Sequence, residues 1–151
     1  FKQKTAYEIY QCDWSSDVCS SDQVGMAVSH SGFHKHGAYL TVNADLPGFT
    51  KQEQHILSIL VLSQKGNLKK VSEALALPDL AKAILSLRLA ILFSHSRIDL
   101  SDELVGVRIR HKIEIDIPGA MLRKHPTLAH WLQKEQAAWS EIDWPLIVRQ
   151  Y

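Results

Sequence analysis

The sequence predicts a mainly α-helical chain that ends in a small mixed α/β unit. Up to about residue 97, apolar side chains recur at spacings of three and four, which is the period of amphipathic helices. From residue 105 on, apolar and charged side chains alternate in two short runs, which is the pattern of β-strands. A further helical stretch and a last short apolar run follow. We therefore expect a helical bundle over residues 23–99 and a small α+β (ββαβ) domain over residues 100–151.

The early helices carry their own start and stop signals. A glycine break at Gly32 precedes a helix expected over residues 34–43. Thr50 and Glu53 have the spacing of a capping box, in which each residue satisfies a backbone N–H of the other. A helix is therefore expected over residues 50–64.

Two further helices complete the expected bundle. Residues 67–77 are predicted to form one short helix that carries Lys69 and Lys70. Pro78 then opens the next helix, because proline is favoured in the first helical turn. Residues 80–94 are apolar nearly all round, so they are expected to form the central buried helix.

The C-terminal domain begins with a predicted hairpin. Residues 105–109 and 113–117 alternate between apolar and charged side chains, and a tight turn at residues 111–112 would join them. An amphipathic helix is expected over residues 127–142, and the third strand over residues 146–148.

The composition is that of an ordinary globular protein. Of the 151 residues, 46% are hydrophobic and 22% are charged, and the formal net charge is +1. The bulk charge therefore gives no signal for a polyanionic partner. No apolar run reaches the ~18 residues that a membrane-spanning helix requires, so we expect no membrane association.

Residues 1–22 differ from the rest, because they show no apolar period and hold both cysteines, Cys12 and Cys19. KQKTAYEI and DWSSDVCSSD are what the two constant parts of a common sequencing-library adapter encode, with room between them for its variable index. We interpret this stretch as a translated artefact, expected to be disordered, fused to a truncated reading frame. The other 129 residues carry 15 basic and 12 acidic groups and no cysteine, which fits a cytoplasmic protein.

The stretch HSGFHKHGAYL places His30, His34 and His36 within seven residues. His34 and His36 would point to different faces of a helix, and Gly32 interrupts the helix between His30 and His34. Three interpretations stay open: a metal site, an anion-binding or interface role, and ordinary packed or solvated histidines. Lys35 slightly favours an anion, since cationic donors bind phosphate.

The remaining candidates are weaker. Arg88 lies in the middle of a helix, where a buried arginine needs either a ligand or an internal salt bridge. Lys69 and Lys70 fit a solvated helix face as well as an anion site. Trp131 and Trp139 lie eight residues apart on one expected stripe, so both are predicted to pack in the core. No residue is assigned as catalytic or as a metal ligand.

Several motifs resemble one known family: SHSGFHKHGAYL, NADLPGF, the following QEQ helix, SLRLAILF, and IPGAMLRKHPTLAHWLQKEQAAW. From Gln23 to its end, the chain resembles the C-terminal part of the exopolyphosphatase and guanosine pentaphosphate phosphatase (Ppx/GppA) family. The resemblance implies a helical domain related to the His-Asp (HD) phosphohydrolase fold, incomplete at its N-terminus, and then the family's small last domain. Full-length members also have an actin-like N-terminal half, which holds the phosphates, magnesium and the catalytic carboxylates.

The sequence departs from the family pattern where the HD fold would bind metal. A His-Glu-Ile-Gly stretch usually stands where residues 22–25 stand here, and Gln64 replaces a later histidine. The resemblance therefore implies no metal or other cofactor for this chain, and magnesium only for the full-length enzyme.

The resemblance implies a role in binding rather than in catalysis. The partners would be polyphosphate or guanosine pentaphosphate, bound through the full-length enzyme, and a second copy in a homodimer. The substrate choice would depend largely on the absent half. Two alternatives stay open: a degenerate HD-type metal phosphohydrolase, and a non-enzymatic helical module that binds nucleic acid through the ββαβ tail, a partner that we do not expect. The expected anion contacts are His34, Lys35, His36, Lys69 and Arg88.

Overall fold

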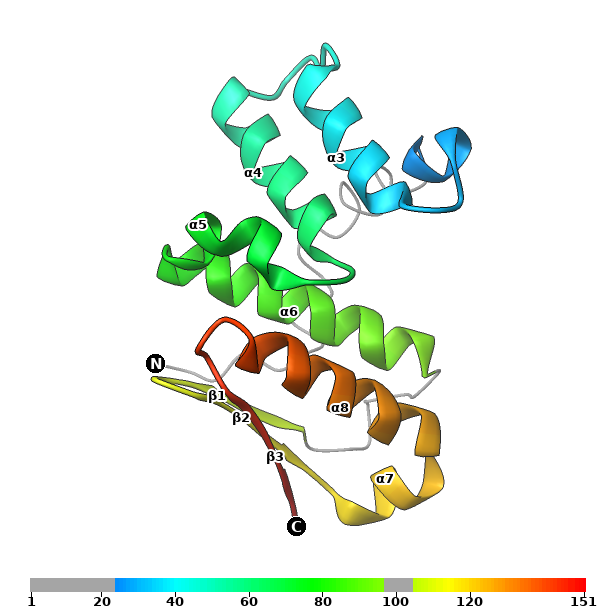
Figure 1. Cartoon of the computed structure of the whole chain (residues 1–151), viewed down its shortest axis with the longest axis vertical. Helices are drawn as coiled ribbons and strands as arrows, with labels where there is room; N and C mark the ends of the chain where they lie inside the picture. Colours follow the sequence, from blue (N-terminus) through cyan, green and yellow to red (C-terminus); the bar gives the residue numbers. More distant parts are fainter. Residues whose placement is uncertain (1–23, 97–104) are drawn as a thin grey trace. The chain divides into compact units, whose positions relative to one another are not determined.

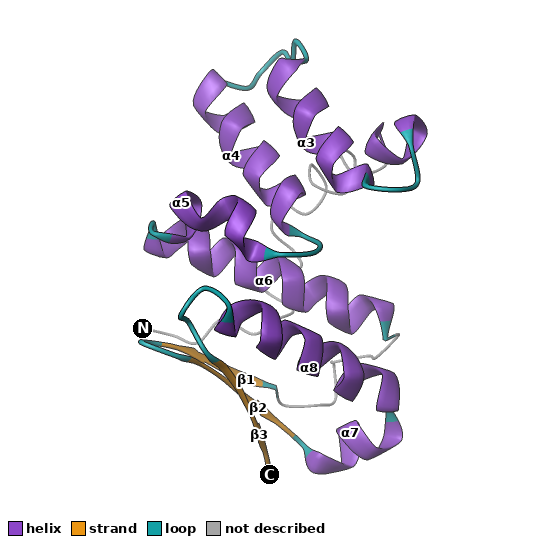
Figure 2. Ribbon diagram, viewed as in Figure 1, coloured by secondary structure: helices purple, strands orange, loops and turns teal. Residues whose placement is uncertain are grey.

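The computed structural model describes residues 24–96 and 105–151, and its elements are mainly helical with one three-stranded sheet (Figures 1 and 2). The expected mainly α chain with a small α+β part is confirmed. The artefact expected over residues 1–22 lies outside the described residues.

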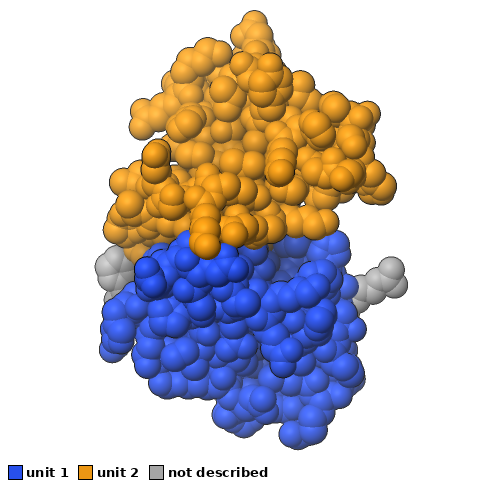
Figure 3. Space-filling view, viewed as in Figure 1, with its two compact units in different colours: residues 1–10, 88–151 blue, residues 11–87 orange. Residues whose placement is uncertain are grey.

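The chain divides into two compact units between Leu87 and Arg88 (Figure 3). We call them the helical unit, described over residues 24–87, and the sheet unit, described over residues 88–96 and 105–151. The division falls inside a helix, α6 (Pro78–His95), which contributes residues to both units. The domain boundary expected between residues 99 and 100 stays a prediction.

The helical unit begins with a short helix over residues 24–28, which approaches α3 (Phe33–Asn43) through a buried glycine. A Cβ atom on Gly25 would overlap the backbone carbonyl of Phe33 and would lie 2.8 Å from the backbone nitrogen of Gly37. Only a residue without a side chain permits this approach of two backbones.

The next helix, α4 (Lys51–Ser63), begins at the predicted capping box. The backbone N–H of Thr50 donates to Glu53 Oε2 at 2.7 Å, and the N–H of Glu53 donates to Thr50 Oγ1 at 3.2 Å. The helix packs against α3 (Figure 1). Gly66, with φ 82°, follows its end in the left-handed conformation that glycine adopts at low cost.

The single helix expected over residues 67–77 is wrong. The chain forms a 3₁₀ turn, η1 (Leu68–Val71), and then one α-helical turn, α5 (Ser72–Leu75). The side chain of Asn67 accepts a hydrogen bond from the N–H of Lys69 at 2.6 Å and so caps the 3₁₀ turn. In a 3₁₀ turn, residues three apart lie on the same side, which places both Leu68 and Val71 in the core.

The last helix of this unit, α6, begins at Pro78 as predicted. Its buried residues follow one stripe, while Lys82, Ser94 and His95 are exposed. The stripe is Ala81, Ile84, Leu85, Arg88, Leu89, Leu92 and Phe93.

The sheet unit confirms the predicted ββαβ order. Strand β1 (Gly106–Ile109) pairs antiparallel with β2 (Ile113–Ile117), and β3 (Leu146–Gln150) pairs parallel with β2. The crossover from β2 to β3 contains α7 (Gly119–Lys124), which was not predicted, and α8 (Pro126–Ser140). Figure 2 shows α8 running along one face of the sheet.

The core of the sheet unit lies between α8 and the apolar face of β2. Ile113, Ile115 and Ile117 are fully buried, as the alternation predicted. Trp139 on α8 is 0% exposed, which is also as predicted. Trp131 is 42% exposed, so its expected place in the core is wrong. Eight residues turn a helix by ~80° beyond complete turns, which carries Trp131 off the apolar stripe.

Candidate anion-binding site

The predicted histidine segment forms the start of α3. Gly32 precedes this helix with φ 73°, and no side chain caps the helix. His34, Lys35 and His36 occupy its first turns, which contain no acidic residue. The exposed N–H groups of a helix start carry positive partial charge, and here no side chain of the first turn offsets it.

Two lysines from other elements reach this helix start. Lys65, which follows α4, places its Nζ 5.3 Å from the ring centroid of Phe33. Lys70 in η1 donates from Nζ to the backbone carbonyl of Lys65 at 2.5 Å. We call the resulting group the cationic cluster, and its members are His34, Lys35, His36, Lys65 and Lys70.

The electrostatics of His34 report how these charges lie. Burial lowers the pKa of His34, and the nearby Lys70, Lys35, Lys65 and His36 lower it further, to about 4. Within the part of the chain that the structure describes, its Nδ1 atom is buried without a hydrogen-bond partner. His34 is therefore neutral at neutral pH, and the lysines carry the charge of the cluster.

The sign of the surrounding charge is uniform. Among the described residues, the side chains that shift the pKa of His34 are all basic, and no carboxylate contributes. Like charges repel one another, so a bound anion would lower the electrostatic energy of these basic side chains.

The structure brings together only some of the predicted candidates. His34, Lys35 and His36 share the cluster, but Lys69 is exposed and is not among the groups that act on His34. Sequence reasoning did not assign Lys65 at all and treated Lys70 only as one of two helix lysines. Both reach α3 through tertiary folding across about thirty residues of chain, for which the sequence has no local signal.

Arg88 belongs to the sheet unit and is 5% exposed. Its guanidinium donates two hydrogen bonds of 2.8 Å to the carboxylate of Glu135 on α8, one from Nε and one from Nη2. This is the internal salt bridge that the sequence left open. Two parallel bonds of this kind are the strongest arginine–carboxylate geometry.

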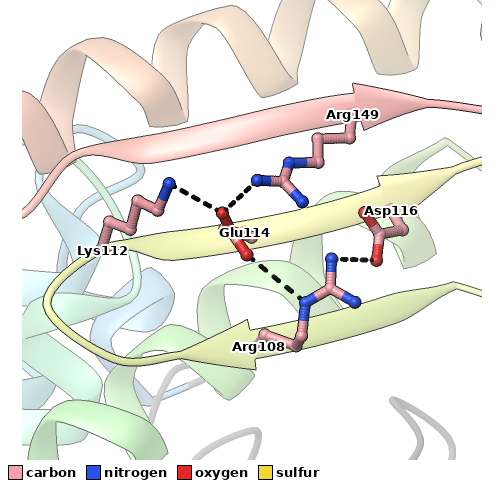
Figure 4. Close-up of polar contacts among 5 residues, drawn as sticks. All are labelled: Arg108, Lys112, Glu114, Asp116 and Arg149. Carbon is pink, nitrogen blue, oxygen red and sulfur yellow. Dashed lines mark hydrogen bonds and ion pairs between the residues drawn. The ribbon is translucent and has the colours of Figure 1, made fainter.

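A second charged group lies on the sheet, on the side chains that alternate with the buried isoleucines (Figure 4). Glu114 forms ion pairs with Lys112 at 2.9 Å, Arg149 at 2.5 Å and Arg108 at 3.4 Å. Arg108 also pairs with Asp116 at 2.7 Å. The hydrogen bond from Lys112, followed by the charge of Arg149, lowers the pKa of Glu114. This sheet network links all three strands, and each of its three cations pairs with a carboxylate.

Metal binding was also considered for these residues. Across residues 24–96 and 105–151, no group of three or more His, Cys, Asp or Glu side chains is arranged to hold a metal ion. In the same part of the chain, no helix combines the length and apolar character needed to cross a membrane.

The protein is mainly helical, and basic side chains gather at the start of α3. A family model, Ppx/GppA phosphatase domain III, matches residues 4–136. The chain belongs to the Ppx/GppA phosphatase family, and the resemblance seen in its sequence is confirmed. The match begins inside the stretch that we interpret as translated adapter, and that interpretation stays a prediction.

Proposed function

We propose that this chain is the polyanion-binding C-terminal part of an exopolyphosphatase-type hydrolase. The parent enzyme would release orthophosphate from the ends of polyphosphate, or the 5′-phosphate of guanosine pentaphosphate. Family membership supports the reaction class. The observation that carries the binding role is the convergence of five basic side chains on the start of α3, with no carboxylate among the described groups that act on His34.

The chemistry of the cluster suits a chain of phosphates. Lysine ammonium groups bind phosphate as point charges with several donors, and they do not demand one fixed geometry. Lys65 and Lys70 come from segments on either side of Gly66, so they can contact neighbouring phosphates of one chain. Such binding releases counter-ions and weakens steeply as salt is added.

We assign hydrolysis to the full-length enzyme rather than to this part. Magnesium and the catalytic carboxylates would belong to the actin-like half that the family resemblance implies. The described residues of this chain would contribute polyanion binding and contacts in a homodimer. The enzyme would act in the cytoplasm.

Polyphosphate binding by the 151-residue chain tests this proposal. We expect replacement of Lys65 and Lys70 by glutamine to weaken binding of long-chain polyphosphate about ten-fold or more at low salt, because two phosphate contacts are lost. The matched control replaces Lys51 and Lys82, two exposed lysines of the same unit. It removes the same charge and should change affinity only slightly.

A phosphate-release assay with magnesium separates binding from catalysis. The chain should bind polyphosphate and release no orthophosphate from it. Equal loss of binding in the cluster variant and in its control would contradict the assignment of the site. Release of orthophosphate by the chain would contradict the assignment of hydrolysis to the full-length enzyme.

A further inference from the structure

The outer side of α8 displays an indole ring beside basic side chains. Trp131 is 42% exposed, and the Nζ of Lys134 lies 4.6 Å from its ring centroid. The ring of His130 meets it edge-on, with centroids 5.9 Å apart and an angle of 62° between the planes. A large aromatic ring exposed among cations is the usual platform for stacking an unpaired nucleobase.

The two helices next to this ring expose basic rather than acidic side chains. Residues 119–140, all of which the structure describes, contain one carboxylate, Glu135, and Arg88 holds it in the bidentate ion pair. The exposed side chains of α7 and α8 include Arg123, Lys124 and Lys134 and no acidic residue. Neither Arg123 nor Lys124 forms an ion pair within the described part of the chain.

These side chains are close along the chain and along the helix. Arg123 and Lys124 end α7, and α8 begins directly afterwards at Pro126 (Figure 1). Trp131 lies in the second turn of α8, and Lys134 follows it by three residues, ~5 Å further along the helix axis. Arg123 places its Nη1 beside Gly119, at the start of α7. We call Arg123, Lys124, His130, Trp131 and Lys134 the α7–α8 group.

We propose that the α7–α8 group binds single-stranded nucleic acid. An unpaired base would stack on Trp131, and the phosphates on either side of it would meet Lys134 and the pair Arg123 and Lys124. The exposed ring distinguishes this partner from a bare phosphate chain, which has no planar group to stack. A duplex is a poorer fit, because its bases are already stacked and paired. The sequence led us to expect no nucleic-acid partner, and the exposure of Trp131 is the observation that favours this proposal instead.

The test uses the 151-residue chain and a fluorescein-labelled oligouridine of about ten nucleotides, whose bases stack weakly on one another. Fluorescence anisotropy at low salt gives the affinity. Trp131→Leu should weaken binding about ten-fold or more, because one stacked base is lost. Trp131→Phe keeps an aromatic face and should retain most of the affinity. Three cationic contacts predict that the logarithm of the affinity falls with the logarithm of salt at a slope of about −2.

A second variant keeps the test independent of one substitution. Replacement of Arg123 and Lys124 by glutamine should weaken oligouridine binding and make the salt slope shallower, while the Lys51 and Lys82 control should leave both nearly unchanged. All these side chains are exposed, and circular dichroism would confirm that the variants are folded. The proposal is overturned if Trp131→Leu binds as tightly as the unmodified chain. It is equally overturned if the chain binds polyphosphate at a given salt concentration but not oligouridine.

Discussion

The cationic cluster of the helical unit and the sheet network of the sheet unit differ in the signs of their charges. In the sheet network, Glu114 and Asp116 offset the cations beside them, and each charge has a partner of opposite sign. In the cationic cluster, every described side chain that acts on His34 is basic. Ion pairs between strands stabilise the fold, whereas a group of basic side chains is suited to bind an anion.

The largest expected effect comes from removing the carboxylate of the ion pair between Arg88 and Glu135. Glu135→Ala leaves the guanidinium of Arg88 buried without its carboxylate, and should lower the free energy of unfolding by about 3–5 kcal/mol. Urea unfolding of the chain measures this change. The control is Lys82→Ala, which breaks an exposed pair with Asp79 and should cost less than about 0.5 kcal/mol.

The double variant Arg88→Met with Glu135→Leu sharpens this prediction. It removes both charges and should recover most of the lost stability, because an apolar pair needs no desolvation of ions. If Glu135→Ala alone unfolded at the same urea concentration as the unmodified chain, the pair would not stabilise the sheet unit.

A smaller effect is expected from the cationic cluster as the pH falls. The pKa of His34 is about 4 in the folded chain and near 6.5 when unfolded, so the unfolded state takes up a proton first. Stability should therefore fall between about pH 6.5 and pH 4. His34→Gln should make thermal unfolding less dependent on pH in this window. An unchanged dependence would contradict a lowered pKa of His34 in the folded chain.

The sheet network should respond in a lower pH window. The folded pKa of Glu114 is depressed, so its contribution to stability is present above its ordinary pKa of 4.5 and is lost as the pH falls below it. Glu114→Gln should cause a small loss of stability at neutral pH that added salt reduces, since the partners are partly exposed. Thermal unfolding at two salt concentrations measures it. A loss as large as that of Glu135→Ala would contradict the ranking.

Local signals in the sequence accounted for most of the fold. The capping box of Thr50 and Glu53 and the alternating isoleucines of β2 each act within a few residues, and the structure has both. The short helix α7 was not predicted. Residues 67–77 form two short elements in place of the expected single helix, because capping at Asn67 and packing outweighed the helical pattern. Trp131 was misplaced because the apolar stripe of α8 is narrower than its sequence pattern indicated.

The candidate site was predictable only in part, for a related reason. His34, Lys35 and His36 are neighbours in sequence, so their grouping was visible. Lys65 reaches them through the turn after α4, and Arg88 finds Glu135 at a separation of 47 residues. Periodicity identifies the face of a helix on which a side chain lies, but it does not identify the partner on another element.

The pKa of His34 tests most directly whether the cationic cluster binds polyphosphate. It would be measured by an NMR pH titration of the imidazole with and without long-chain polyphosphate. We expect a pKa of about 4 for His34 in the free chain. Bound polyphosphate should raise it by a unit or more, because an anion beside the ring stabilises the imidazolium form. A pKa that stayed the same when polyphosphate bound would show that the anion lies elsewhere, and would contradict the assignment of the cationic cluster as its site.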